Sequence, residues 1–506
     1  MKLNYKRTVF VGMAFFLILA FWQAYDAIIP LILTNHFGLP QSASGVIMSI
    51  DNVLAVFLLP LFGSLSDKVK TKMGKRKPFI LIGTIAAVIL FVGLTFVDNV
   101  QLAAVLEDGT TLPTYETVKA EKDAAEDLYN EAKATKDETL IASAKEEFDL
   151  KQEAYDSTMA RLNKKALDLT ISNPLPLIGF MVTLLLVLFA MAVFRSPAVA
   201  LMPDITVKPL RSKGNAIINL MGTAGGILVL VLGMIFDTSG NKYMRYTGYV
   251  IAVCAIMISG LCTFILTVKE RKWAEEMELD TKRLGLEEPA ELNKNDLGEK
   301  RSLSRAELKS LILILASVAL WYVGYNSITS KYSVYATNVL FFDFNATLII
   351  AQAAAVIAYI PVGMVASRIG RRKTILAGIT MLASAFFIGN FISFDTPEIV
   401  MYPVFILAGI GWATINVNSF PMVVELAKGG EVGKYTGYYY TASMAAQIVA
   451  PILSGFLYDL FGMRIMFFSF GTLFVALSFV TMFFVKHGDA KAEKVDALSA
   501  LGGADD

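Results

Sequence analysis

Cysteine and histidine are scarce in this sequence, with two residues of each among 506. Cys254 and Cys262 lie about two helical turns apart in one apolar run, too far for a disulfide, so we interpret them as packing residues. His36 and His487 lie at the ends of apolar segments, which argues against a histidine metal site or a buried proton switch. No residue pattern indicates a cofactor, a metal or a catalytic nucleophile, so we do not expect an enzyme.

An excess of charge of one sign is also missing. Lysine and arginine number 45 against 44 acidic residues, so nothing in the balance suggests nucleic acid as a partner. Hydrophobic residues, in contrast, make up 55% of the chain, more than a soluble protein of this length carries. The first apolar run is too long for the core of a signal peptide, so we expect it to remain as a membrane helix.

Twelve apolar runs of about 20 residues or more, each long enough to cross a bilayer as a helix, divide the chain. We therefore predict an all-α integral membrane protein with twelve transmembrane helices. The predicted spans cover residues 8–35, 43–65, 78–97, 174–203, 213–236, 245–268, 308–336, 345–366, 373–394, 399–424, 434–458 and 464–486.

Basic residues gather in alternate connections, which places those connections on the cytoplasmic side. Both termini are then cytoplasmic, and we expect a multi-pass protein of the plasma membrane. The connections opposite are poor in basic residues, with Lys242 and Arg245 as the main exceptions. The cytoplasmic basic residues are Lys2, Lys6, Arg7, Lys68, Lys70, Lys72, Lys75, Arg76, Lys77, Lys208, Arg211, Lys213, Arg368, Arg371, Arg372 and Lys373.

Three polar segments interrupt or follow the apolar pattern. Residues 98–173 are expected outside the cell, where apolar residues at helical spacing predict an antiparallel helical hairpin turning near 134–137. A disordered tether is the alternative for such a charged segment. Residues 269–307 form a predicted cytoplasmic linker, and residues 487–506 a cytoplasmic tail.

The chain contains an internal repeat. Phe21–Asp26 aligns with Trp321–Asn326, and Arg195–Asp204 aligns with Asn416–Glu425 once the segment 98–173 is left out. The spans therefore form two six-helix copies, with the segment 98–173 as an insertion in the first. We predict two pseudo-symmetric bundles, residues 1–268 and 308–486, related by an axis normal to the membrane.

Two motifs resemble those of a known family. They are Gly63-x-x-Ser66-Asp67-Lys68-x-x-Thr71-Lys72-x-Gly74-Lys75-Arg76-Lys77-Pro78 and Pro197-x-x-Ala200-Leu201-x-x-Asp204. The first resembles the loop between helices two and three in the major facilitator superfamily, and both resemble its sucrose/glycoside–cation symporter branch. Relatives that use sodium carry two aspartates before the proline of the second helix, where this chain has Ala55 and Leu59. This departure argues against that sodium site.

Ionisable residues inside apolar spans are costly and are therefore candidates for function. Asp26 and Asp51 lie at a similar predicted depth in neighbouring spans and are candidates to carry a proton, although Asp51 alternatively is a polar helix contact. Arg195 is a candidate either to bind sugar or to act at an inner gate. We interpret Lys331 as a residue whose ammonium reaches the membrane interface.

The resemblance also implies which helices line a central cavity: the first, fourth, seventh and tenth. Aromatic rings there stack on sugar rings and amides bond to hydroxyls. Ordinary helix packing is the alternative interpretation for any one aromatic residue. With Arg195, the substrate-binding candidates are Trp22, Gln23, Tyr25, Trp321, Tyr325, Asn326, Trp412, Asn416 and Asn418. The charges that resemble the superfamily's inner-gate network are Asp67, Arg76, Asp204, Arg372 and Glu425.

From these features we predict a secondary transporter, working by alternating access as a proton-coupled symporter of a disaccharide or glycoside. Its expected partners are that small molecule, the coupling proton and the lipid bilayer, and we expect a monomer. Two alternatives remain at this point. One is a transporter or exporter of a non-sugar solute, and the other is a membrane sensor that does not transport and uses the predicted hairpin to bind a partner.

Overall fold

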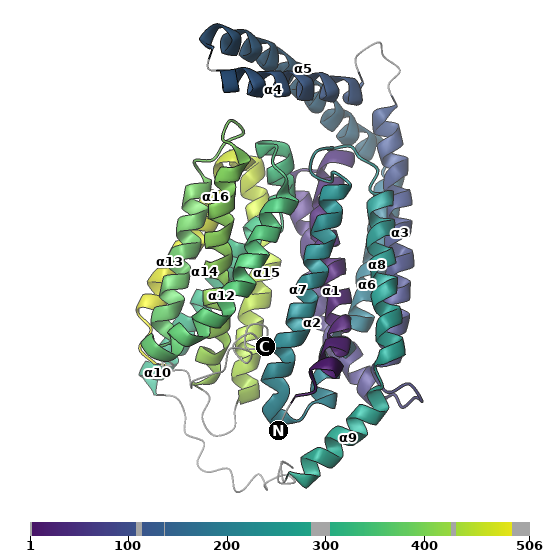
Figure 1. Ribbon diagram of the computed structural model, residues 1–506, viewed down its shortest axis with the longest axis vertical. Helices are drawn as coiled ribbons and strands as arrows, with labels where there is room; N and C mark the ends of the chain where they lie inside the picture. The colour runs from purple at the N-terminus through teal and green to yellow at the C-terminus, as the bar shows by residue number, and fades with distance from the viewer. Residues whose placement is uncertain (1–2, 108–113, 136, 285–303, 427–431, 488–506) are drawn as a thin grey trace.

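A computed structural model describes residues 3–107, 114–135, 137–284, 304–426 and 432–487. The regular structure of these residues is helical, apart from one isolated bridge between Thr71 and Gly74. Long helices run roughly alongside one another in two groups, and two further helices lie across one end (Figure 1). We call the end that carries those two helices the outer end, and the opposite end the inner end.

The first bundle contains six long helices. Within it α1 packs on α7 and α8, and α3 packs on α6. A π-helical turn, η1 (Ile32–His36), continues α1 to its outer end. The six are α1 (Tyr5–Leu31), α2 (Gln41–Lys68), α3 (Lys77–Leu106), α6 (Leu175–Ile205), α7 (Arg211–Ile235) and α8 (Thr247–Thr267), with the short 3-10 helix η2 (Lys208–Leu210) before α7.

The second bundle repeats this arrangement. Its first helix is interrupted where the sequence predicted one span over 308–336: it ends at Thr329, and a short helix and a second π-helical turn follow. Ser304 and Glu307 form a capping box that fixes where this helix begins. The elements are α10 (Arg305–Thr329), α11 (Tyr332–Tyr335), η3 (Ala336–Leu340), α12 (Phe344–Ile369), α13 (Arg371–Gly389), η4 (Glu398–Val400), α14 (Met401–Val424), α15 (Val432–Phe461) and α16 (Met463–Phe483).

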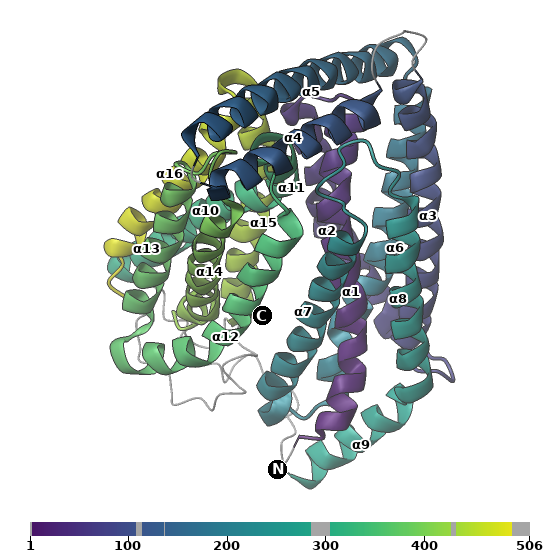
Figure 2. The same cartoon turned by 45° about the horizontal axis from the view of Figure 1, so that its top comes forward.

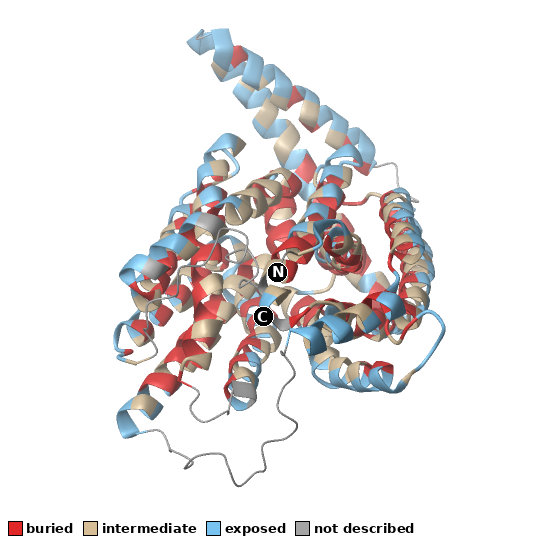
Figure 3. Ribbon diagram, turned by 60° about the horizontal axis from the view of Figure 1, so that its bottom comes forward, coloured by how far each residue is buried: buried red, intermediate tan, exposed pale blue. Residues whose placement is uncertain are grey.

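Eleven helices of the described residues are long and apolar enough to cross a membrane. The twelfth is α12, with 26 residues and a shorter apolar stretch, Phe344–Tyr359. Large apolar side chains point away from both bundles, and Phe57, for example, is 69% exposed. Buried positions lie inside the bundles and exposed ones at their periphery (Figure 3). The predicted multi-pass, all-helical fold is confirmed.

The segment that interrupts the first bundle contains two helices, α4 (Tyr115–Thr135) and α5 (Glu138–Ser172), which pack on each other. Asp137 caps α5 by accepting bonds from the backbone of Thr139 and Leu140. The predicted start of the insertion at residue 98 was wrong, because α3 continues to Leu106 and buries Asp98 inside the bundle. A buried partner for this carboxylate, described below, lets the helix extend past it.

The two bundles meet at the outer end. There α2 packs on α15, α7 on α12 and α1 on α11. The contact between α2 and α15 is very close, because a Cβ atom at Gly45 would collide with the carbonyl oxygen of Pro451. Toward the inner end the ribbons of α7 and α12 diverge (Figure 2).

One helix of the predicted linker is described, α9 (Glu270–Arg283). It packs on α6 at the inner end. Arg7 connects it to the start of α1, with Nη1 2.5 Å from Glu276 and the guanidinium 5.2 Å from the ring centroid of Trp273. Residues 285–303 of the linker and the tail beyond residue 487 lie outside the described residues.

Candidate functional site

A cavity of about 440 Å³ lies between the two bundles. Five of the residues singled out in the sequence line it: Trp22, Gln23 and Asp26 from α1, Tyr325 from α10 and Trp412 from α14. Its volume falls within the range of sites for small molecules, roughly 300–1,000 Å³. The cavity is therefore the candidate binding site.

The register of α1 explains how three of these residues reach the cavity. Trp22, Gln23 and Asp26 recur at the spacing of one helical face, which continues in Leu19 and Ala27. The opposite face of α1 carries Phe21, Ala24, Tyr25 and Ile28, all buried in the core. One helix thus supplies both the packing of the first bundle and a wall of the cavity.

Flat aromatic surfaces form another wall. The rings of Tyr325 and Trp412 stack with centroids 3.7 Å apart and planes 6° from parallel, and Tyr322 contacts Trp412 edge-on at 5.4 Å. On the other side, the first bundle presents the ring of Trp22, which meets the ring of the buried Tyr25 edge-on at 5.3 Å. The two bundles thus present indole and phenol rings to one space, an arrangement suited to stacking against a ring-shaped solute.

Amide groups cross the cavity from one bundle to the other. Nε2 of Gln352 in α12 donates to Oε1 of Gln23 in α1 at 2.7 Å. Gln23 was a candidate from the sequence, whereas Gln352, Tyr359 and Thr223, which also line the cavity, were not. A lone glutamine in an otherwise apolar span was the available signal for Gln352.

The three charged candidates of the first bundle differ in their surroundings. The side chain of Asp26 is exposed within the cavity, while Asp51 is half-buried and accepts a bond from Nδ2 of Asn52 at 2.8 Å. The guanidinium of Arg195 lies 5.4 Å from the ring centroid of Trp22, behind that ring, and within electrostatic reach of Asp51. Asp51 thus lies near the positive charge of Arg195, whereas Asp26 lines the cavity.

Several substrate-binding candidates do not line the cavity among the described residues. Trp321 and Tyr25 are fully buried, so their rings pack the bundles. Asn326 and Asn418 donate to carbonyls of their own helices, those of Tyr322 and Thr414. Asn416 is half-buried in α14. Residue type did not distinguish residues that line the cavity from residues that pack helices together, because aromatic and amide side chains do both.

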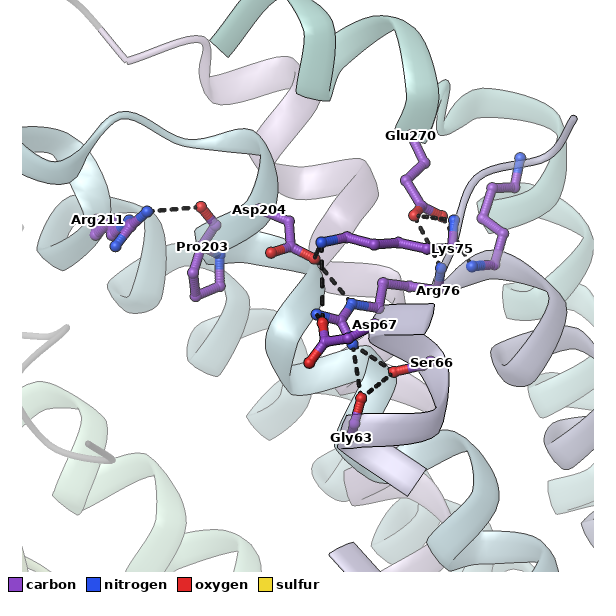
Figure 4. A network of polar contacts seen from close by, with 10 residues as sticks. Gly63, Ser66, Asp67, Lys75, Arg76, Pro203, Asp204, Arg211 and Glu270 are labelled. Carbon is purple, nitrogen blue, oxygen red and sulfur yellow. Dashed lines mark hydrogen bonds and ion pairs between the residues drawn. The ribbon is translucent and has the colours of Figure 1, made fainter. Parts of the chain in front are cut away.

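A charged network joins α2, α3 and α6 at the inner end (Figure 4). The guanidinium of Arg76 contacts Asp67 at 2.5 Å and Asp204 at 2.8 Å, and Lys75 lies 3.2 Å from Asp204. Glu270 of α9 accepts the backbone N–H groups of Lys75, Arg76 and Lys77 at 2.7–2.8 Å, where α3 begins. The predicted inner-gate residues Asp67, Arg76 and Asp204 thus contact one another within the first bundle.

The corresponding network of the second bundle differs from the prediction. Arg371, rather than Arg372, contacts Glu425, at 2.7 Å. Arg372 instead donates to the carbonyl of Phe483 and lies over its ring. Neighbouring arginines point to different sides of a helix, so the motif alone did not determine which one reaches Glu425.

Two buried groups depart from what the sequence indicated. His36 is fully buried, and its Nδ1 lies 2.7 Å from Oδ1 of the equally buried Asp98, a burial that its place at the end of an apolar segment did not indicate. Lys331 does not reach an interface either: it is buried between the bundles, with Nζ 2.5 Å from the hydroxyl of Ser44. Asp98 is distant in sequence from His36, and Ser44 is distant from Lys331, so neither contact could be predicted from a local pattern.

Comparisons with known proteins agree with this architecture. A family model described as MFS/sugar transport protein matches residues 10–110, and one described as Major Facilitator Superfamily matches residues 332–500. A curated relative, the MFS-type transporter ppzB of Metarhizium rileyi, is 28% identical over 116 residues. That match spans 22% of this chain and 23% of the relative, so it supports the resemblance over less than a quarter of either protein.

Solved structures match over nearly the whole chain. The inward open conformation of the xylose transporter XylE from E. coli has a TM-score of 0.60 at 12% identity and covers 97% of this chain and 98% of its own. A POT family transporter in complex with 5-aminolevulinic acid has a TM-score of 0.58 at 10% identity, covering 94% and 95%. At these identities the likeness concerns the fold alone. Residues 10–110 and 332–500 thus match these two family models, and the chain as a whole shares the fold of these solved transporters.

Proposed function

We propose that this protein is a proton-coupled symporter of a disaccharide or related glycoside that works by alternating access in the plasma membrane. The observation that carries the proposal is the cavity between the bundles, where aromatic rings, two glutamines and one exposed carboxylate meet. Rings stack on the C–H faces of sugars, and amides offer both donors and acceptors to hydroxyl groups. The sucrose/glycoside branch and the cytoplasmic position of both termini belong to the same proposal.

Asp26 is the proposed proton carrier. Its carboxylate is exposed to the cavity, so both solute and solvent reach it, and its repeat counterpart is the neutral Asn326. Asp51 has the lesser role, because it is engaged by Asn52 and lies within electrostatic reach of Arg195. A proton on Asp26 neutralises a charge in the cavity, which lowers the cost of closing the bundles around the loaded site.

Alternating access requires two arrangements of the bundles that share one site. The described arrangement has its bundles in contact at the outer end and diverging toward the inner end (Figure 2). We infer that it is the inward-facing state. The charged network around Arg76 and Asp204 would then stiffen the inner end of the first bundle and bias the closure of that end.

Uptake into proteoliposomes tests the function. Labelled sucrose, maltose and a panel of non-sugar solutes are offered with and without an inward proton gradient. We expect gradient-stimulated accumulation of a glycoside by the native protein. If the gradient stimulates uptake of a non-sugar solute only, the proposed substrate class is overturned. If the protein binds a solute but takes up none, the membrane sensor is favoured.

The coupling role is tested separately by Asp26→Asn, with Asp395→Asn as a matched change of an exposed carboxylate outside the cavity. A carrier that lacks only its proton-binding group should still exchange internal for external solute. It should no longer accumulate solute on a gradient. Undiminished accumulation by Asp26→Asn would remove Asp26 from the mechanism and leave the substrate assignment standing.

A further inference from the structure

The α4–α5 pair is seated directly on the outer end of the first bundle. Gly38, with φ +65°, lies so close to α5 that a Cβ atom would come within 2.6 Å of the backbone nitrogen of Leu167. The hydroxyl of Thr170 donates to the carbonyl of Phe37 at 2.9 Å, and Nε2 of Gln101 in α3 donates to that hydroxyl at 3.2 Å. The inserted helices therefore move with the first bundle.

The connection between α7 and α8 is bound to the same unit. The backbone N–H of Lys242 donates to the hydroxyl of Tyr115 in α4 at 3.1 Å. The hydroxyl of Tyr243 donates to Oδ1 of Asn163 in α5 at 2.7 Å, and the rings of Tyr115 and Tyr243 meet edge-on at 5.3 Å. This second set of contacts holds Lys242 in a fixed, buried position.

Phe341 of the second bundle packs against this unit. Phe341, which connects η3 to α12, meets the ring of Tyr155 in α5 edge-on at 6.3 Å. Nζ of Lys242 lies 4.6 Å from the centroid of the Phe341 ring, and Nζ of Lys122 lies 5.4 Å from it. Both ammonium groups also lie near the ring of Tyr155, at 5.5 and 5.8 Å. Two lysines and two aromatic rings thus form one cluster across the boundary between the bundles.

The backbone of Phe341 indicates that its position is held by its surroundings. Its φ of +58° is left-handed, which is uncommon for a bulky residue without such support. Lys122 is also bound to Glu126 at 2.7 Å, so its charge is balanced within α4. In Figure 2 the two inserted helices extend from the end of α3 across toward the second bundle. The insertion therefore spans the boundary that must open if the outer end is to face solvent.

We propose that α4, α5 and the connection between α7 and α8 form a clasp that holds the outer end closed. The clasp consists of Lys122, Tyr155 and Lys242, which contact Phe341. The clasp regulates the cycle of the proposed transporter and in that sense rests on the proposed function. Any motion that separates the bundles at the outer end must withdraw Phe341 from the cluster. The contacts contribute only to the closed form, so they bias the equilibrium between the two forms without touching the solute.

Spin-label distances test the clasp without any transported solute. Ser172→Cys and Asp395→Cys place labels at exposed sites on α5, which is seated on the first bundle, and on the second bundle, after Cys254 and Cys262 are replaced by alanine. Phe341→Ala in this background removes the residue that the clasp holds. We expect the population with separated outer ends to rise about fivefold relative to the closed one, as for the loss of one cation–π contact.

The matched control is Tyr129→Ala, which removes an aromatic contact between α4 and α5. Tyr129 stacks on Phe148 at 5.8 Å within the inserted pair itself. A clasp predicts that Phe341→Ala and Tyr155→Ala shift the distances while Tyr129→Ala leaves them unchanged. Unchanged distances in Phe341→Ala, or equal shifts in all three variants, would overturn the clasp. Because the readout is a distance, this failure is separate from a failure of sugar uptake.

Discussion

The carboxylate of Asp459 in α15 accepts the backbone N–H of Gln41, the first residue of α2, at 2.7 Å. A second bond at 2.7 Å reaches the N–H of Ser42. The residue before the helix is Pro40, whose side chain offers no cap, so the first turn of α2 is capped by a residue of the other bundle. A negative charge at this position also suits the helix dipole.

Removing this cap should loosen the outer end. Asp459→Ala leaves two N–H groups of α2 without their acceptor, a loss of about 1–2 kcal/mol for a helix cap. We expect faster hydrogen–deuterium exchange in a peptide covering residues 38–46, by several-fold. Asp395→Ala, which removes an exposed carboxylate, should leave that peptide unchanged. Equal exchange in both variants would show that Asp459 does not cap α2 in the membrane.

The two aspartates that bind Arg76 should differ in their effect on stability. Asp204 is 22% exposed and Asp67 is 58% exposed at the side chain, so water replaces Asp67 more readily. Asp204→Asn should lower stability by about 1–3 kcal/mol, because it weakens charge-assisted bonds to both Arg76 and Lys75. Asp67→Asn should cost about 1 kcal/mol or less. Thermal unfolding in detergent measures both losses. A larger loss for Asp67→Asn than for Asp204→Asn would contradict the stronger role of Asp204.

The His36–Asp98 contact joins η1 to α3, and both side chains are fully buried. Asp98→Ala leaves His36 without its partner in the protein interior, which should cost about 3–5 kcal/mol. The double variant His36→Leu with Asp98→Leu removes both polar groups and should recover much of that loss. Thermal unfolding of the native, single and double variants forms the test. A double variant no more stable than Asp98→Ala would show that the pair is not the source of the loss.

Lys242 should make the outer end sensitive to pH. In the closed form, burial lowers the pKa of Lys242 from 10.5 to about 7, with Asp156 opposing and Lys122 adding to the effect. Cation–π attraction to Tyr155 and Phe341 favours the charged form by about 2 kcal/mol. That is less than the cost of burial, because each pKa unit corresponds to about 1.4 kcal/mol.

The sign of the pH effect follows from this lowered pKa. Once the clasp opens and water reaches the ammonium, its pKa rises toward 10.5, so the open form binds more protons between these values. The closed form should therefore lose stability as the pH falls from about 10 to about 7, with little further change below. Spin-label distances at about pH 9 and pH 7 measure the shift. Lys242→Met should abolish it, and a shift that persists would assign it to another group facing Lys242: Lys122, Asp156, Tyr115, Tyr155 or Tyr243.

Much of the architecture could be read from the sequence because it is encoded locally. A helix buries its own backbone bonds, so an apolar run of sufficient length specifies a membrane span without knowledge of its neighbours. The match of Phe21–Asp26 to Trp321–Asn326 likewise identified the first helix of each bundle. The resemblance indicated that the first helix lines a cavity, and Trp22, Gln23 and Asp26 do lie on the face that lines it, whereas the candidate Tyr25 lies on the buried face.

Other features depend on pairs of residues that only the tertiary structure brings together. No local sequence pattern predicts contacts between residues that are distant in the chain. Examples are the contacts His36–Asp98, Lys331–Ser44 and Asp459–Gln41. Tertiary packing also decided that Trp321 fills the second bundle while Trp412 lines the cavity. Residue types and their period determined the helices, and the partner that each side chain meets determined its role. A buried ionisable group is stabilised by such a partner, and His36 is the partner that explains the burial of Asp98.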